Sequence, residues 1–515
     1  MSSRITAPMS FLGITRRTAV RLLAVAAMVG LPLRTATPAR ALAWPVFNYD
    51  PAHSGSASRD HSFSSANVGT LHRRWVATFD DIADSTPILL THVRMPRGGA
   101  ENLLFQTTIH GTTYAVNADS GTIVWRFATR PPRMYPQSPN DVGSKITTST
   151  PVADPTGRYI YAPGRDGYVH KLTAATGAEV RGRGFPLQIT RMPDVEKNAS
   201  ALNLAHGYLY AATSGYIGDQ GPYDGHVVVL RLRDGATHVF NTLCSTIHHL
   251  LLDKSYDPRS DYSCPQVTSG IWSRAGVVVD PDPAMGGRIY VTTGNGLFDA
   301  NRGGADYGDS VLALSADGTR LLGSFTPSDY NDLQANDIDL GSTAPALLPR
   351  EPRSRTPLMA VQGGKDGLIR LLNRAHLGGV HGELQDLQAP GAVLFSAPAV
   401  WRGPGGTWVY LGDNSNVTAL RLVTNAHGVS RLVVAWTAPV AGTSPVVSGG
   451  VVFVSGSGAL SALEARSGRI LWSSRQASTG GTIGDIHWES PVAVNGRVYI
   501  SDQASHLTAY ALPGR

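Results

Sequence analysis

The chain has 515 residues, of which 42% are hydrophobic and 16% charged, which excludes a disulfide-stabilised miniprotein and a disordered tail. Its 56 glycines and 33 prolines predict frequent turns and favour many short strands over long helices. The formal net charge of +6 comes from residues 1–43, which contain six arginines and no acidic residue. The rest of the chain is neutral and gives no support to nucleic-acid or anionic-membrane binding.

Residues 1–43 have the order of an export signal, in which basic residues precede an apolar run and a small-residue cleavage position. Arg16 and Arg17 precede the run from Leu22 to Val29, and Ala41-Leu42-Ala43 follows. The adjacent arginines resemble a twin-arginine signal, and an ordinary secretory signal or an uncleaved anchor are the alternatives. The run is shorter than the roughly 20 residues that span a bilayer. We therefore expect an exported protein, periplasmic, envelope-associated or extracellular, whose mature part covers 44–515.

The chain has two cysteines, Cys244 and Cys264. In an oxidising compartment they are expected to form a disulfide, and two free buried thiols are the alternative. No Cys-x-x-Cys-His motif is present, which excludes covalently attached c-type haem.

One pattern recurs along residues 44–515: a small residue and proline, an apolar strand, a strand with aromatic and β-branched residues, a glycine turn and a third strand. The clearest copies open at Ser444-Pro445 and Ser490-Pro491. Other copies open at Thr86-Pro87, Thr150-Pro151, Ala344-Pro345 and Ala397-Pro398, and two degenerate ones near Asn198-Ala199-Ser200 and Gly270-Ile271-Trp272. The sequence therefore contains eight copies.

Eight repeats of short antiparallel strands predict an all-β fold, an eight-bladed β-propeller with four strands in each blade. Trp125 and Trp472 follow the glycine turns and are expected to pack between neighbouring blades. The last copy lacks its fourth strand, and residues 71–79 form an unassigned strand near the other end. We expect this N-terminal strand to close the ring, because closure hides an exposed sheet edge. A stacked β-solenoid is the structural alternative.

The repeat resembles the eight-bladed propeller of quinoprotein alcohol dehydrogenases and of their non-enzymatic relatives, the outer-membrane assembly lipoproteins. The matching pattern is Ser/Thr-Pro followed by Leu-x-Ala-x-x-x-x-Ser/Thr-Gly-x-x-x-Trp. It covers essentially all of 44–515 and specifies the fold better than the function.

A sharper resemblance runs from Trp272 to Arg374 and implies a site for pyrroloquinoline quinone and calcium. Trp272 stands where the family has its aromatic floor, and Asn295, in Thr293-Gly294-Asn295, where it has a calcium ligand. By the same resemblance Asp337 is the catalytic base, with Asp339 in reserve. Lys365, in Gly364-Lys365-Asp366-Gly367, is the residue that contacts the quinone.

The sequence also departs from the family. The adjacent cysteine pair is replaced by Ile146-Thr147-Thr148-Ser149-Thr150, and the calcium-binding glutamate of blade three has only Asp219 as a counterpart. The insert from Asn241 to Cys264 resembles an exported branch that includes polyvinyl-alcohol-dehydrogenase-like proteins. Each site residue also has a structural interpretation: Trp272 as an interface ring, Asn295 as a turn residue, and the acids and Lys365 as surface charges.

Two function classes follow. The first is an exported quinoprotein oxidoreductase acting on an alcohol or sugar hydroxyl of a small molecule or polymer, with a separate electron acceptor. The second is a non-catalytic propeller that binds protein or polysaccharide at the cell surface. The two differ in whether Trp272, Asn295, Asp337 and Lys365 meet at the axis of the propeller.

Overall fold

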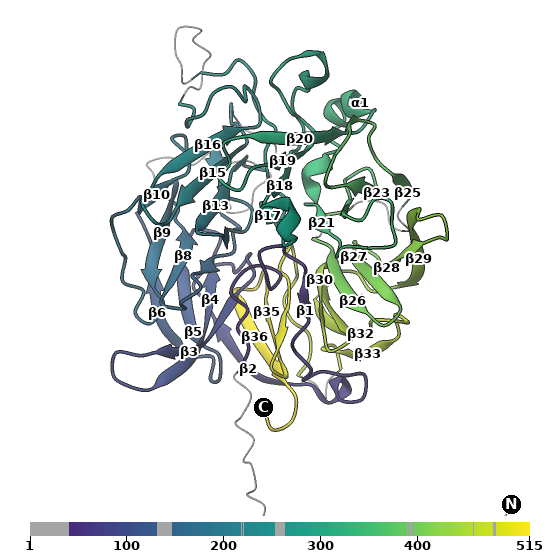
Figure 1. The fold of residues 1–515 in the computed structure, drawn as a ribbon. Helices are drawn as coiled ribbons and strands as arrows, with labels where there is room; N and C mark the ends of the chain where they lie inside the picture. Colours follow the sequence, from purple (N-terminus) through teal and green to yellow (C-terminus); the bar gives the residue numbers. More distant parts are fainter. Residues whose placement is uncertain are drawn as a thin grey trace, which may run out of the picture. The chain divides into compact units, whose positions relative to one another are not determined.

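The computed structural model of the protein describes residues 41–515 except 131–146, 218, 220, 253–262, 389, 391–393, 396, 457 and 477–479. Residues Ala41–Arg515 form one compact unit, in which eight sheets of four or five strands surround a central axis (Figure 1). The predicted eight-bladed β-propeller is confirmed. The twin-arginine pair and the apolar run of the predicted export signal lie outside the described residues, so that signal stays a prediction.

Within each blade the strands are antiparallel neighbours ordered from the axis to the rim. The first four blades consist of β3 (Ile88–Arg94), β4 (Ala100–Thr107), β5 (Thr113–Asn117) and β6 (Ile123–Phe127); β7 (Val152–Ala153), β8 (Tyr159–Pro163), β9 (Tyr168–Thr173) and β10 (Leu187–Gln188); β12 (Asn203–Ala205), β13 (Tyr208–Ala212), β15 (His226–Arg231) and β16 (Thr237–Asn241); and β17 (Val278–Val279), β18 (Ile289–Thr292), β19 (Val311–Leu314) and β20 (Leu321–Thr326). Strand β24 (Gly379–Val380) adds to β20 in parallel.

The other four blades complete the ring. They consist of β21 (Ala346–Leu347), β22 (Met359–Gln362), β23 (Leu368–Asn373) and β25 (Gln385–Gln388); β26 (Ala399–Gly403), β27 (Gly406–Gly412), β28 (Val417–Thr424) and β29 (Ser430–Ala438); β30 (Thr443–Ser448), β31 (Val451–Gly456), β32 (Ala459–Glu464) and β33 (Ile470–Ser473); and β34 (Val492–Val494), β35 (Arg497–Ser501), β36 (His506–Ala511) and β2 (His72–Thr78). The remaining elements are β1 (Ser56–Ala57), β11 (Glu196–Lys197), β14 (Ser214–Gly215), α1 (Tyr330–Ala335) and the short 3-10 helices Val68–Thr70, Pro283–Met285, Ala300–Arg302 and Leu340–Ser342.

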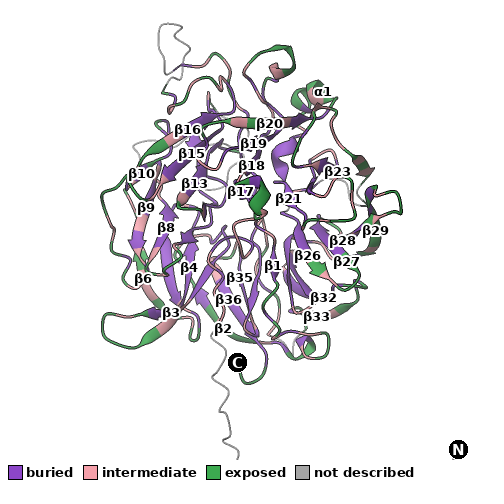
Figure 2. Cartoon of the chain, in the orientation of Figure 1, coloured by how far each residue is buried: buried purple, intermediate pink, exposed green. Residues whose placement is uncertain are grey.

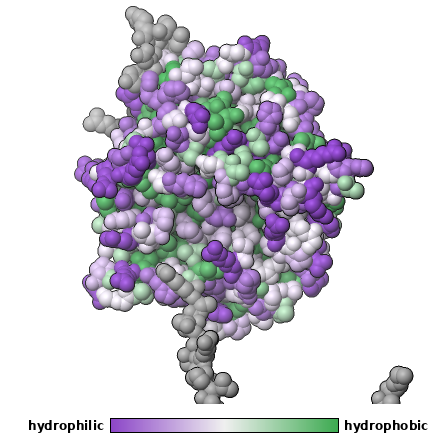
Figure 3. All heavy atoms as spheres, in the orientation of Figure 1, coloured by the Kyte–Doolittle hydropathy of each residue, from purple (hydrophilic) through white to green (hydrophobic). Residues whose placement is uncertain are grey.

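The core lies between the blades rather than inside one layer. Inner strands are buried on both faces, which explains their continuous apolar runs, and the exposed residues gather at the rim (Figure 2). One apolar cluster, for example, joins Ile88 and Phe105 of the first blade to Ile160 and Leu172 of the second. On the face drawn in Figure 3 hydrophobic residues form small patches among hydrophilic ones, as on most folded proteins.

The ring is closed by the strand that the sequence predicted. Strand β2 pairs antiparallel with β36, from His72 opposite Ala511 to Thr78 opposite His506. Residues from the two ends of the chain therefore share the last blade, and no open edge remains between the first repeat and the last.

Tryptophans at the rim dock onto glycine turns of the next blade. The Trp125 indole donates a 2.9 Å hydrogen bond to the carbonyl of Ala174, and its ring lies over Gly177, which has a φ of +68°. A Cβ at Gly177 would lie 2.6 Å from that ring, so glycine is required there both for the backbone conformation and for the approach. The same contact joins Trp75 to Ala118 and Gly121, and Trp436 to Ala465 and Gly468.

The segment 44–60, which we call the axial segment, closes one end of the central channel and was not anticipated from the sequence. It winds once around the axis and exchanges backbone or side-chain hydrogen bonds with the inner region of seven blades. The partners are Trp44 with Leu89, Pro45 with Ala153, Pro51 with Asn203 and Val279, Ser54 with Val400, Gly55 with Val447, and Asp60 with Asn495. Phe47 belongs to the same apolar cluster as Leu347 of the remaining blade. Strand β1, part of this segment, pairs with β30 on its axial side (Figure 1).

The predicted disulfide is present. Cys244 and Cys264 are bonded to one another. No helix in the described part of the chain is long and apolar enough to span a membrane.

The tryptophan docking predicts a specific stability effect. Gly177→Ala should destabilise the fold by about 1–3 kcal/mol more than Gly157→Ala, because overpacking against Trp125 adds to the strained backbone. Gly157 is the matched control, since its φ is +67° and a Cβ there would meet nothing within 4 Å. Urea unfolding of the two variants measures the difference, and equal losses would show that the docking is not tight.

Candidate functional site

The site lies at one end of the channel because every repeat enters the propeller there. Each inner strand begins a few residues after its repeat opens, so the segments before the inner strands converge at the same end of the axis. The loops after the second strands return to that end, since neighbouring strands are antiparallel. The axial segment contacts residues within and after the inner strands, as at Val447 and Ser448 of β30.

Trp272 lies in the segment before β17 and is partly exposed. The Nζ atom of Lys365 is 5.4 Å from the centre of its ring, and the ring of Trp488 stacks on it at 5.6 Å between centroids. Gly294 permits this arrangement, since a Cβ there would lie 3.0 Å from the Trp272 Nε1 atom and 2.5 Å from a carboxylate oxygen of Asp339. Trp272 thus offers an aromatic surface bordered by charged groups.

Lys365 joins the two aspartates proposed as base and reserve. Its Nζ lies 2.9 Å from Asp337 Oδ1 and donates also to the Asp337 carbonyl, and it forms an ion pair with Asp339. Asp339 is buried, with 4% of its side chain exposed, whereas 66% of the Asp337 side chain is exposed. Both acids follow α1 on the connection between the fourth and fifth blades.

Burial and charge act in opposite directions on this group. Burial raises the pKa of Asp339, and Lys365 lowers it in part. Burial lowers the pKa of Lys365, but the Asp339 and Asp337 carboxylates outweigh it, so the net shift is upward. The ammonium group is therefore held charged at neutral pH.

Asn295 connects this group to Asp219. Its backbone N–H donates a 2.6 Å hydrogen bond to Asp339 Oδ1, and its side-chain amide donates a 3.1 Å bond to Asp219 Oδ2. Tyr223 donates from its hydroxyl to the other oxygen of Asp219 at 2.6 Å. All five residues named from the sequence, Trp272, Asn295, Asp219, Asp337 and Lys365, thus lie together.

Asp309 is a further acid of the site. Its side chain is buried, Oδ1 accepts the backbone N–H of Leu340 at 3.0 Å, and Oδ2 has no hydrogen-bond partner among the described residues. Burial raises the pKa of Asp309 well above its usual range, and Asp339 adds to the rise. An unpartnered carboxylate oxygen beside two more acids indicates that the site accommodates positive charge.

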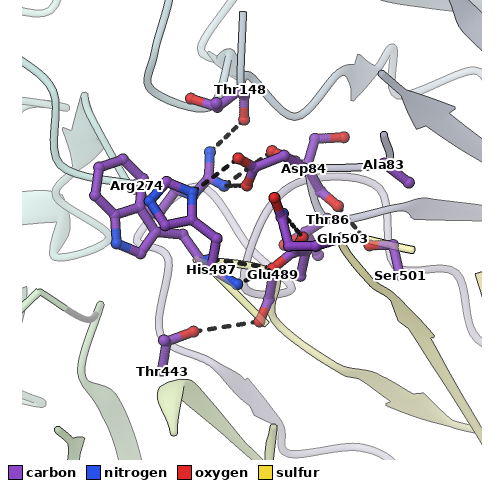
Figure 4. Close-up of polar contacts among 12 residues, drawn as sticks. Ala83, Asp84, Thr86, Thr148, Arg274, Thr443, His487, Glu489, Ser501 and Gln503 are labelled. Carbon is purple, nitrogen blue, oxygen red and sulfur yellow. Dashed lines mark hydrogen bonds and ion pairs between the residues drawn. The ribbon is translucent and has the colours of Figure 1, made fainter. Parts of the chain in front are cut away.

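A second layer of polar side chains is formed by Asp84, Arg274, His487 and Glu489 (Figure 4). Arg274 precedes the fourth blade, and its guanidinium pairs with Asp84, before the first blade, at 2.8 Å and donates to the carbonyl of Thr148, before the second. His487 Nδ1 lies 2.8 Å from the other oxygen of Asp84. The rings of His487 and Trp488 stack at 4.1 Å, and the Arg274 guanidinium lies 5.2 Å from the Trp488 ring.

Glu489 fixes the loop that carries these rings. Its carboxylate accepts the backbone N–H groups of His487 at 2.7 Å and Trp488 at 3.0 Å, and the side chain of Gln503 donates to its other oxygen. Burial and the nearby Asp84 raise the pKa of Glu489 to about 8. These hydrogen bonds fix the backbone that places Trp488 against Trp272.

The second layer was missed because its members share no motif. Asp84, Arg274 and Glu489 each stand within a few residues of a repeat opening, at Thr86, Trp272 and Ser490. Aligning the eight openings by eye would have brought these three charges into one ring. The ring of His248 lies 5.2 Å from that of His238 in the third blade's outer strand, outside the site.

A metal ion would need Asn295 as well as carboxylates. Among the residues that the structure describes, no group of three or more His, Cys, Asp or Glu side chains is arranged to hold a metal. Asp219 and Asp339, bridged by Asn295, offer two carboxylates and an amide, which are the oxygen donors that hard cations prefer. The donor set and the unpartnered oxygen of Asp309 fit such an ion, and the partly exposed Trp272 fits a flat ring.

Comparison with known proteins supports the same fold. Residues 400–514 match the family model described as outer membrane protein assembly factor BamB. A europium-containing methanol dehydrogenase is similar over 91% of this chain and 98% of its own, with 13% identity and a TM-score of 0.64. The likeness to quinoprotein propellers is confirmed. At this identity it shows the fold.

Two quinohemoprotein alcohol dehydrogenases are similar as well. The enzyme of Pseudomonas putida has 14% identity and a TM-score of 0.61, with 92% of this chain and 80% of that chain covered. The enzyme of Comamonas testosteroni has 16% identity and a TM-score of 0.59, with 92% and 81% covered. A comparison with curated proteins gives no match.

The buried acids predict an unusual pH dependence of stability. Burial raises the pKa of Glu489 and of Asp224 to about 8 and that of Glu196 to about 7. Acids whose pKa is higher in the folded state stabilise it below their unfolded pKa, and this contribution is lost as pH rises through the folded pKa. We expect the Tm to fall between about pH 5.5 and about pH 8.5.

Glu489→Gln should reduce that fall in Tm, because the amide cannot ionise. Glu351→Gln, which changes a carboxyl on the β21–β22 connection, is the control and should leave the pH dependence as it is. A Tm that rises with pH in the unmodified protein would contradict the prediction.

Proposed function

We propose that the protein is an exported oxidoreductase that binds pyrroloquinoline quinone and a hard metal ion at the mouth of its axial channel. Its substrate would be an alcohol or sugar hydroxyl. The observation that carries the proposal is the contact chain Asp219–Asn295–Asp339–Lys365–Asp337 beside Trp272. The solved structures similar to it include alcohol and methanol dehydrogenases, one of which contains europium.

The different burial of Asp339 and Asp337 suggests different roles, metal binding for the first and proton acceptance for the second. Asp339 is buried and hydrogen-bonded to Asn295, so it would hold the metal together with Asn295 and Asp219. Asp337 is the exposed one, so a substrate entering from the mouth can reach its carboxylate. Asp337 would accept the hydroxyl proton at its carboxylate, in the role of a general base.

Trp272 and Lys365 would bind and orient the quinone. The indole of Trp272 would carry the flat ring, and the Lys365 ammonium, 5.4 Å from the ring centre, would contact its oxygens. When bound, the quinone supplies a two-electron acceptor. A separate protein or small molecule would then take the electrons, since the chain has no Cys-x-x-Cys-His motif for haem.

The chain departs from the resembled family on the side of the site that faces Trp272. Its only cysteines, Cys244 and Cys264, are bonded to one another in the insert. Thr148 stands in the region of the missing cysteine pair, and its carbonyl accepts a hydrogen bond from Arg274. The residue that stacks on Trp272 is instead Trp488 from the entrance to the last blade.

The metal would be calcium or a more highly charged ion. Asp219, Asp309, Asp337 and Asp339 stand near one lysine, and this excess of acid favours a cation of charge two or three. The europium in the methanol dehydrogenase makes a lanthanide a reasonable second metal to test.

A non-catalytic propeller is the second candidate function. The match of residues 400–514 to the assembly-factor model favours it, since that model describes an outer-membrane assembly protein. Such a protein would bind protein or polysaccharide at the cell surface. Export would suit both candidates, as does the disulfide, because disulfides persist in oxidising compartments.

A quinone titration at low and high calcium tests the proposal. Lys365→Ala should weaken quinone binding about tenfold or more at any calcium level, because a charge-assisted contact is lost. Asn295→Ala and Asp339→Asn should weaken it in a way that higher calcium partly restores, since each loses an oxygen ligand. If the unmodified protein binds no quinone with calcium or europium, the enzyme function is wrong and the binding propeller replaces it.

Substitutions of Asp337 and Asp339 should have different effects on quinone binding and on turnover. Asp337→Asn should leave quinone binding nearly intact and reduce turnover of an alcohol by a factor of about 10² to 10⁴. Asp329→Asn, an exposed acid on the same connection, is the control and should change neither. Full turnover by Asp337→Asn would assign the base elsewhere.

A further inference from the structure

A crevice lies between the sixth and seventh blades, away from the axial site. It is formed by β27, β28 and β29 of one blade and the β32–β33 turn of the next, which lie side by side in Figure 1. Its volume is about 590 Å³, which is within the usual range for small-ligand sites.

Arg421 lines the crevice. Its guanidinium lies 5.8 Å from the ring centre of Trp408, a buried tryptophan whose indole donates to the Pro404 carbonyl at 3.2 Å. The Nε atom of Arg421 is buried and has no hydrogen-bond partner among the described residues. A buried donor without an acceptor is costly. The terminal nitrogens of Arg421 also have no hydrogen-bond or ion-pair partner among the described residues, so they are the donors that a ligand in the crevice can reach.

The other charged side chains of the crevice do not pair with Arg421. Glu464, the acid of the crevice, accepts the Ser467 hydroxyl at 2.6 Å and lies 3.6 Å from the Arg469 guanidinium. Arg466 lines the crevice and has no acidic partner among the described residues. The crevice is therefore lined by two arginines and one carboxylate, and that carboxylate lies beside a third arginine, Arg469.

An apolar wall borders the two arginines. Val433 and Val434 are 42% and 44% exposed, although they are adjacent on one strand. The pairing of β28 with β29 passes from Leu420 opposite Val434 to Ala419 opposite Trp436, so Ala435 is an extra residue. This bulge turns both valines outward, and Figure 2 shows β29 partly exposed.

We propose that this crevice binds a carboxylate attached to a short apolar chain. The carboxylate oxygens would accept hydrogen bonds from the two terminal nitrogens of Arg421, which is the paired geometry that guanidinium groups favour. Arg466 would add charge at the entrance, and the apolar chain would lie on Val433 and Val434. Such a group occurs on a free monocarboxylate or at the carboxyl terminus of a peptide.

The test uses the purified protein labelled with 5-fluorotryptophan, with the Trp408 resonance as the reporter. Hexanoate should shift that resonance in a saturable way, and hexanamide, its neutral counterpart, should not. A peptide ending in Val-Leu with a free carboxylate, compared with its amidated form, tests the second source. Shifts by hexanoate alone assign a free acid, and shifts by the peptide carboxylate at lower concentration assign a chain terminus.

Two variants separate binding from structure. Arg421→Met should weaken hexanoate binding about tenfold or more and should leave the Tm without ligand unchanged or raised, because an unsatisfied buried donor is removed. Arg431→Gln, on the same strand pair, is the control and should bind normally. The proposal is overturned if no probe binds saturably, if Arg421→Met binds as well as the unmodified protein, or if its Tm drops while binding is unchanged.

Discussion

The shared direction of the eight inner strands determines which loops and segments meet to form the candidate site. All eight repeats enter at the same end of the central channel, so residues just before each inner strand and just after each second strand meet there. An eight-bladed ring leaves a channel at its axis, and the axial segment 44–60 closes the opposite end through hydrogen bonds to seven blades. A single mouth results, in which Trp272, Asn295 and Lys365 approach one another although they are far apart in sequence.

Charge within that mouth defines what it can bind. Lys365 is shared by Asp337 and Asp339, and Asp309 keeps one buried carboxylate oxygen without a partner among the described residues. Burying so many acids is unfavourable unless cations balance them. In the second layer the buried acid Asp84 is neutralised by an ion pair with Arg274. The group around Lys365 therefore has fewer cationic side chains than acidic ones.

The repeat made the fold predictable, and local spacing made part of the site predictable. The openings at Ser444 and Ser490, the spare strand 71–79 and the turn glycines each have a direct physical meaning in a propeller. Trp272, Asn295 and Lys365 belong to short motifs, so they were found. The axial segment has no repeat and no motif, and most of its hydrogen bonds to the blades are made by backbone groups, which every residue type supplies. Trp488 and Arg274 depend on tertiary contacts across the axis, which spacing along the chain does not reveal.

The most direct test of this account is a crystal structure of the protein soaked with pyrroloquinoline quinone and europium, with the metal located by its anomalous scattering. The account predicts the quinone ring against Trp272, with its oxygens near Lys365, and the metal peak beside Asn295, Asp339 and Asp219. A metal peak elsewhere, or a mouth that holds neither group at saturating concentrations, would contradict it.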